Sequence, residues 1–110
     1  MSSAAAQNCL NVISASGQTY PSADALSYAE GICGAVYSFK AAVETGGPTI
    51  NAGNYIAGLN KLGTSFASPV DLGDNFAPNE HDGSAVVGDM TYLGSCNCFR
   101  YVGPPQQIPE

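Results

Sequence analysis

The sequence has few charged side chains and almost no positive ones, which limits the functions open to it. Charged residues make up 11% of the 110 positions, and three basic residues face nine acidic ones, for a net charge of −6. The basic residues are Lys40, Lys61 and Arg100. Nucleic-acid binding needs a basic face that displaces counterions, and anionic membrane surfaces attract basic segments. We therefore predict no nucleic-acid partner and no binding to an anionic membrane.

Long apolar runs and a recognisable leader are also lacking. No stretch of about 20 apolar residues is present, so we expect no membrane insertion. The N-terminal "MSSAAAQNCLNVI" has neither a basic segment nor a long apolar one. With so few charged residues, the surface must consist largely of Asn, Ser, Thr, Gln and Gly, a composition that is common in exported proteins. We therefore expect an extracytoplasmic protein, periplasmic or secreted, whose leader is absent from this chain; the alternative is a cytosolic protein.

Four cysteines offer three possible pairings: Cys9, Cys33, Cys96 and Cys98. Cys9 and Cys33 fall in two predicted helices joined by a loop, so we favour a Cys9–Cys33 disulfide and leave Cys96 to pair with Cys98. In an extended strand the last two Cα atoms would lie about 6.6 Å apart, near the upper limit for a disulfide. Zinc sites usually combine two close ligand pairs, and redox sites favour C-x-x-C at a helix start. We therefore expect structural disulfides and no metal or cofactor.

Other candidate catalytic groups also favour structural interpretations. His81 lies between Glu80 and Asp82 in "EHDG", which suggests a general base or a metal ligand. Adjacent turn residues cannot all point at one atom, and the sequence holds no second histidine, so we interpret this stretch as a surface turn with Gly83 at positive φ. The sequence has no G-x-S-x-G elbow and no complete phosphate-binding loop. We predict that the protein is not an enzyme.

Hydrophobic periodicity predicts three helices. The first covers residues 4–15, and the second runs from the N-cap Ser22 to about Glu44, where "TGGP" ends it. We expect Thr49 to cap a third helix that Gly63 closes. Gly53 and Gly58 lie inside it and each costs about 1 kcal/mol relative to Ala, so this helix should depend on packing.

The remainder is rich in Gly, Pro, Asn and Asp and reads as loops with short strands. Alternation predicts strands in "SAVVGDMTYLG" and in "CNCFRYVG", joined by a short turn. The fold class is therefore α/β or α+β, with two to three helices packed on one face of a small terminal β-sheet. Residues 1–103 would form a single partial domain and residues 104–110 a Pro-rich tail.

Residues 21–102 resemble the C-terminal portion of type I periplasmic solute-binding proteins, the receptors of branched-chain amino-acid and amide ABC transporters. The matching succession is "SADALSYAEGICGAVYSFKAAVETGG", then "NAGNYIAGLNKLG", then "FAPNEHDGSAVVGDMTYL", and last the strand "CNCFRYVG". Such receptors have two α/β lobes around a ligand cleft. The resemblance implies a fragment or derivative of a substrate-binding protein for an amino acid or similar small polar solute.

The resemblance also implies where a ligand would bind. In these receptors the start of the corresponding helix faces the cleft, which makes Tyr20 and Ser22 the expected ligand contacts. An incomplete lobe would leave apolar surface and sheet edges uncovered, so we expect a homo-oligomer formed through one of them. The alternative function is a stand-alone, self-associating structural or interaction protein.

Overall fold

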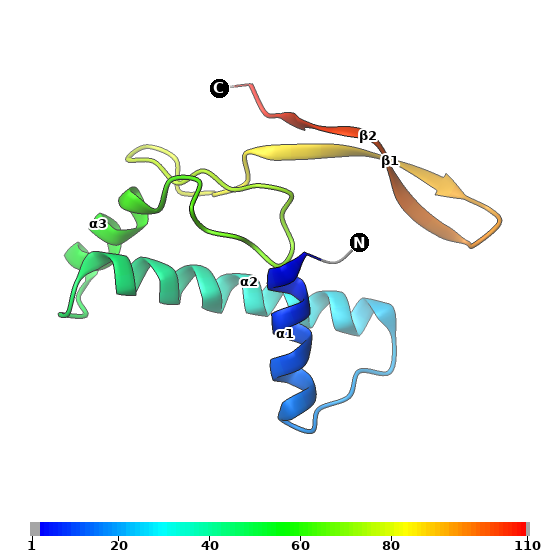
Figure 1. The fold of residues 1–110 in the computed structure, drawn as a ribbon, viewed down its shortest axis with the longest axis horizontal. Helices are drawn as coiled ribbons and strands as arrows, with labels where there is room; N and C mark the ends of the chain where they lie inside the picture. Colours follow the sequence, from blue (N-terminus) through cyan, green and yellow to red (C-terminus); the bar gives the residue numbers. More distant parts are fainter. Residues whose placement is uncertain (1–2, 110) are drawn as a thin grey trace.

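The computed structural model describes residues 3–109 and has three helices followed by a two-stranded antiparallel sheet. Figure 1 shows the elements in chain order: α1 (Ala4–Ala15), α2 (Ala23–Gly46), α3 (Ala52–Leu62), β1 (Val86–Leu93) and β2 (Cys98–Gln107). Helices and strands are segregated along the chain, and no helix connects the two strands. The predicted fold class is confirmed, in its α+β form.

Each helix begins at a side-chain cap. The Oγ of Ser22 accepts a hydrogen bond from the Ala25 amide at 3.2 Å, as the sequence predicted. The prediction that Thr49 caps α3 is wrong, because Asn51 does so: its Oδ1 accepts from the Asn54 amide at 2.8 Å. Thr49 instead offers its carbonyl to the Asn54 side chain, also at 2.8 Å. Asn is among the strongest N-caps, and here it lies immediately before the first helical residue.

The main apolar cluster forms where α3 crosses the C-terminal part of α2. Its buried members come from both helices and from the segment after α3: Ala42, Leu59, Leu62 and Phe76. Gly58 lies at the crossing point, where a Cβ atom would overlap the carbonyl oxygen of Ala42. The absence of a side chain there lets the two helix backbones approach closely.

Residues 63–85 form an irregular layer between the helices and the hairpin (Figure 1). Backbone hydrogen bonds fold this segment on itself, including Phe76 N–H to Gly63 O at 3.0 Å and Asn75 N–H to Gly83 O at 2.7 Å. The expectation that the helices pack on one face of the sheet is wrong: within residues 3–109, no helix packs directly on a strand. The irregular segment takes that place, and Leu72 from it lies against Gly88 of β1.

The hairpin is regular at its turn and irregular at its open end. Leu93 pairs with Cys98 and Tyr92 with Phe99, while a bulge interrupts the register between Val87 and Asp89. The bulged part of β2 contains Pro104 and Pro105, which have no N–H to donate to a ladder. The rings of Tyr92 and Phe99 meet edge-on at 5.4 Å, a favourable cross-strand contact.

Both expected disulfides are present. Cys9–Cys33 joins α1 to α2 with its Cα atoms 6.0 Å apart, and Cys96–Cys98 closes within the hairpin turn at 5.2 Å. The expectation that Cys96 belongs to an extended strand is wrong, because β2 begins only at Cys98. Asn97 between the two cysteines adopts a φ of 51°, and this left-handed turn shortens the Cα separation below the extended value.

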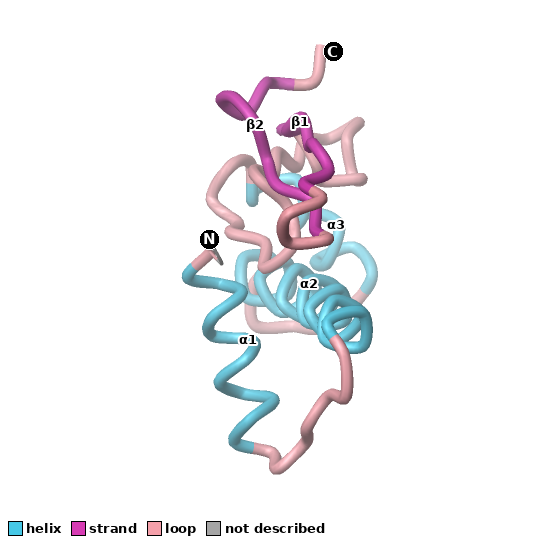
Figure 2. The backbone as a smooth tube through the Cα atoms, turned by 90° about the vertical axis from the view of Figure 1, so that its right-hand side faces the viewer, coloured by secondary structure: helices cyan, strands magenta, loops and turns pink. Residues whose placement is uncertain are grey.

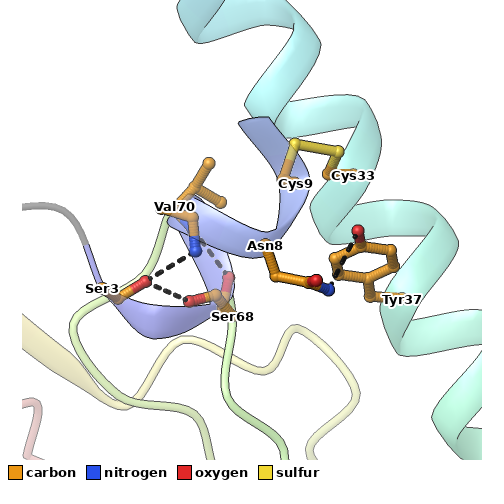
Figure 3. The surroundings of a disulfide bond; sticks show 8 residues. Ser3, Asn8, Cys9, Cys33, Tyr37, Ser68 and Val70 are labelled. Carbon is orange, nitrogen blue, oxygen red and sulfur yellow. Dashed lines mark hydrogen bonds between the residues drawn. A yellow bond between two sulfur atoms is a disulfide. The ribbon is translucent and has the colours of Figure 1, made fainter. Parts of the chain in front are cut away.

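Figure 3 shows how the first disulfide holds α1 against α2. Cys9 is fully buried, and the side-chain amide of the adjacent Asn8 donates to the hydroxyl of Tyr37, one turn along α2 from Cys33, at 3.4 Å. The Ser3 hydroxyl donates to the Ser68 carbonyl, also at 3.4 Å. Both hydrogen bonds are long, so the disulfide is the strongest single link between α1 and the rest of the chain.

The molecule is thin for its length. Its principal extents are 51 × 40 × 17 Å, and its radius of gyration is 15.9 Å. A compact chain of this length would have a radius of gyration of about 13 Å. Figure 2, viewed from the side, shows α1 extending away from one side of α2 and the hairpin lying on the other side, beyond the loops of residues 63–85. Many large apolar side chains consequently remain exposed on α2 and on the hairpin.

Candidate functional site

The two predicted ligand contacts, Tyr20 and Ser22, line one open cavity of about 450 Å³ between the end of α1 and the start of α2. Leu10 and Ile13 of α1 and Leu26 of α2 supply its apolar wall. The loop containing Pro21 connects the two helices and forms the remaining side. The two predicted contacts therefore line the same hollow, which lies where the chain turns from α1 into α2.

The polar groups of this cavity are hydrogen-bond donors at the start of α2. The Ser22 Oγ already accepts the Ala25 amide, which leaves its hydroxyl proton free to donate. The first N–H groups of α2 carry the positive end of the helix dipole, and Asp24 lies in the same turn. Among the residues lining the cavity, Tyr20 is the only titratable one. This arrangement offers an apolar wall beside a few hydrogen-bond donors, as small-molecule sites do.

A second polar cluster lies in the irregular segment and was not predicted. The Ser68 hydroxyl donates to the Asp71 carboxylate at 3.0 Å, and the Ser68 amide donates to the Asp74 carboxylate at 3.3 Å. The Ser68 oxygen accepts from the amides of Val70 and Asp71, both at 3.1 Å. The side chains of Ser68, Asp71 and Asp74 line a cavity of about 420 Å³ next to the hairpin. Leu72 and Val86 line it as well.

Asp74 is the most perturbed acid in this cluster. Only 6% of its surface is exposed. Burial, together with the nearby Asp71 carboxylate, raises the pKa of Asp74 to about 6, against the opposing effect of the Ser68 amide. The cluster holds the 68–74 turn in shape, because Ser68 bonds both aspartates. The signal in the sequence was "SPVD", a serine followed three residues later by an aspartate, which is typical of a side-chain-capped turn.

Asp74 should make the folded state less stable as the pH rises. Its folded pKa lies above its unfolded value of 3.8, so the native state binds more protons than the unfolded state between about pH 4 and pH 6. The contribution of Asp74 to stability is therefore greatest below pH 4 and declines through pH 6, by about 1–2 kcal/mol once partial solvent screening is allowed for. Asp74→Asn keeps the oxygen that accepts from Ser68 and should remove this decline in urea unfolding measured from pH 4 to pH 7.

Asp71→Asn is the matched control for that series. It removes the like charge that raises the Asp74 pKa, so the decline should shift to lower pH without vanishing. If Asp74→Asn leaves the pH dependence of the unfolding midpoint unchanged, Asp74 does not titrate as described.

His81 lies in the predicted surface turn. Its Nε2 is 2.8 Å from Oδ1 of Asn60 on α3, and the imidazole is exposed. Gly83 has a φ of 81°, as expected, and the Phe76 ring packs against it. The turn therefore closes over the small core. Within residues 3–109, no three His, Cys, Asp or Glu side chains are grouped so that they could hold a metal ion.

None of the helices in the described part of the chain has the length and apolarity needed to cross a bilayer. Comparison with protein-family models, with curated proteins and with solved structures finds no match to this chain.

Proposed function

We propose that this chain is a non-catalytic part of an extracytoplasmic solute-binding protein for an amino acid or a similar small polar solute. The observation that carries the proposal is the cavity at the start of α2, where Tyr20 and Ser22 face a hollow walled by Leu10, Ile13 and Leu26. One side of this hollow is open to solvent. A second lobe would close it, and binding by this chain alone would be weak.

The apolar surface of the chain supports the same proposal. Large side chains of α2 and of both strands are exposed, although a soluble monomer of this size rarely exposes so many together. Further protein covering these faces would complete a lobe. Two disulfides, one of them fully buried at Cys9, agree with an extracytoplasmic location.

An amide-resolved NMR titration tests the solute site. We expect millimolar L-leucine, L-valine or acetamide to shift the amide resonances of residues 20–23 and of the facing turn of α1, while the hairpin resonances stay in place. Tyr20→Ala should abolish these shifts, and Tyr92→Ala, an exposed tyrosine on β1, should not. The proposal fails if none of the three solutes moves these resonances at about 20 mM, a concentration that detects even millimolar affinity.

A second candidate function is a stand-alone interaction protein that associates with itself. The specific observation in its favour is the uncovered part of the α2 surface, which carries apolar side chains and no charge.

A further inference from the structure

We propose that two copies of this chain form a two-fold dimer in which their α2 helices pack antiparallel through one uncovered face. This α2 face consists of Tyr28, Gly31, Ile32, Ala35, Val36 and Phe39. The inference rests on the second candidate function and assigns the exposed α2 side chains to a second copy instead of the remainder of a lobe. Its test does not involve the solute cavity, which lies between the end of α1 and the start of α2.

The α2 face continues a surface that is already used for helix packing. Residues 31, 35, 42 and 46 recur at close to helical spacing and share one side of α2. At its C-terminal end α3 covers this side, and Gly58 sits against Ala42 and Gly46. Because α3 has 11 residues and α2 has 24, the N-terminal part of the same side remains bare.

The bare part is both apolar and large. Tyr28 is 79% exposed and Ile32 66%. Phe39, at the border with α3, is 53% exposed, and its ring lies 5.5 Å from that of Tyr55. With Val36 and the small residues beside them, these side chains present on the order of 600 Å². Two such faces would bury roughly 1,200 Å², the lower end of the range for specific interfaces. Buried area alone does not set affinity, and an interface this small is typical of weak, reversible complexes, so we expect dissociation in the micromolar range.

The small residues Gly31 and Ala35 favour another α2 helix as the partner of this face. A Cβ atom built on Gly31 would have no neighbour within 4 Å, so nothing in this chain requires a glycine there, although glycine weakens a helix. Gly31 and Ala35 facing the same residues of a second copy would allow the close backbone approach that Gly58 allows within the chain. The larger side chains of both copies would interlock beside this seam.

The position of α3 selects the antiparallel arrangement, and the charge distribution permits association. In a parallel pair both copies would bring α3 to the same end of the shared face, whereas in an antiparallel pair the two α3 helices lie at opposite ends. The α2 face carries no charge, so the net charge of −6 is not concentrated at the contact. Lys40, just beyond it, is already paired with Glu44 at 2.7 Å. Two α2 faces can therefore meet without repulsion between like charges.

Sedimentation equilibrium of the intact, oxidised chain tests the dimer. We expect the mass to double from 11.2 kDa as the concentration rises through the micromolar range. Ala35→Arg places a charge in the seam at an exposed helix position and should raise the dissociation constant at least about 100-fold. Asn11→Arg makes the same type of change at an exposed position of α1 and should leave dimerisation intact. Circular dichroism verifies that both variants fold.

Three outcomes would overturn the proposal. One is a wild-type chain that stays monomeric at several hundred micromolar. Another is an Ala35→Arg chain that dimerises like the wild type. The third is growth beyond the dimer that is insensitive to Ala35→Arg, which would place the contact at the edge of the β1–β2 hairpin. The solute titration follows the amide resonances of residues 20–23, whereas the dimer test follows the mass of the chain in solution. A negative result in one test therefore does not affect the outcome of the other.

Discussion

Replacing Cys9 and Cys33 together by alanine is expected to release α1 from the fold under native conditions. The bridge closes a loop with a sequence separation of 24 residues, and its loss removes about 3–4 kcal/mol on the chain-entropy model. The other links of α1 are the packing of the small buried Ala6 and the long hydrogen bonds of Asn8 and Ser3, each hydrogen bond contributing about 1 kcal/mol at most. A helix of 12 residues is marginal in isolation, so α1 should unfold while α2 and α3 stay paired.

Far-UV circular dichroism should then lose about a quarter of its helical signal, in proportion to the length of α1. Amide hydrogen exchange should lose protection in residues 4–15 and keep it around Leu59 and Leu62. The matched control is the Cys96→Ala/Cys98→Ala pair, whose bridge spans a sequence separation of 2 in an exposed turn. It should cost about 1–2 kcal/mol at most and leave the helical signal unchanged. Retained protection of α1 in the first variant would show that its packing, not the disulfide, holds it.

The helices could be predicted closely because their signals are local. Side-chain caps, a hydrophobic period and a following Gly or Pro all act within a few residues, so Ser22 was placed correctly and the end of α2 to within two residues. The error at Thr49 arose because two good caps stand two residues apart, and the sequence does not say which one precedes the first turn. The pairing of the four cysteines followed from which elements contain them.

What could not be predicted depends on contacts between distant segments. The position of residues 63–85 between helix and hairpin follows from Leu72 and Phe76, which look like isolated apolar residues within a polar loop. Burial of Asp74 is likewise a tertiary effect, since the same carboxylate in a loop of this composition would ordinarily be exposed. The apolar period of α2 predicts a buried face, but it does not reveal that α3 is too short to cover all of it.

The ligand-site prediction lies between these cases. Tyr20 and Ser22 are neighbours in sequence, so their proximity required no tertiary information. The apolar wall opposite them comes from α1, and its placement depends on the Cys9–Cys33 bridge. Loss of that bridge should therefore also abolish the cavity, which links the solute proposal to the stability of α1.

Gly58→Ala is expected to separate α3 from α2 even though alanine is the better helix former. The new methyl group would overlap the Ala42 carbonyl oxygen and lie 2.7 Å from the Gly46 amide nitrogen, and both are backbone atoms that no rotamer change can move aside. The helices must shift apart, which loosens the contacts of Leu59 and Leu62 in the buried cluster. We expect a loss of about 2–3 kcal/mol in the free energy of unfolding, measured by urea denaturation.

Gly31→Ala is the matched control, because it makes the same substitution inside a helix where nothing lies within 4 Å of the new methyl group. Measured at a concentration low enough to keep the chain monomeric, it should raise the free energy of unfolding by about 0.5–1 kcal/mol through helix propensity and reduced freedom of the unfolded chain. Opposite signs for one chemical change at two helical positions would locate the α2–α3 crossing at Gly58. A stabilising Gly58→Ala would mean that α3 does not approach α2 closely there, and the core around Leu62 and Phe76 would have to be assembled differently.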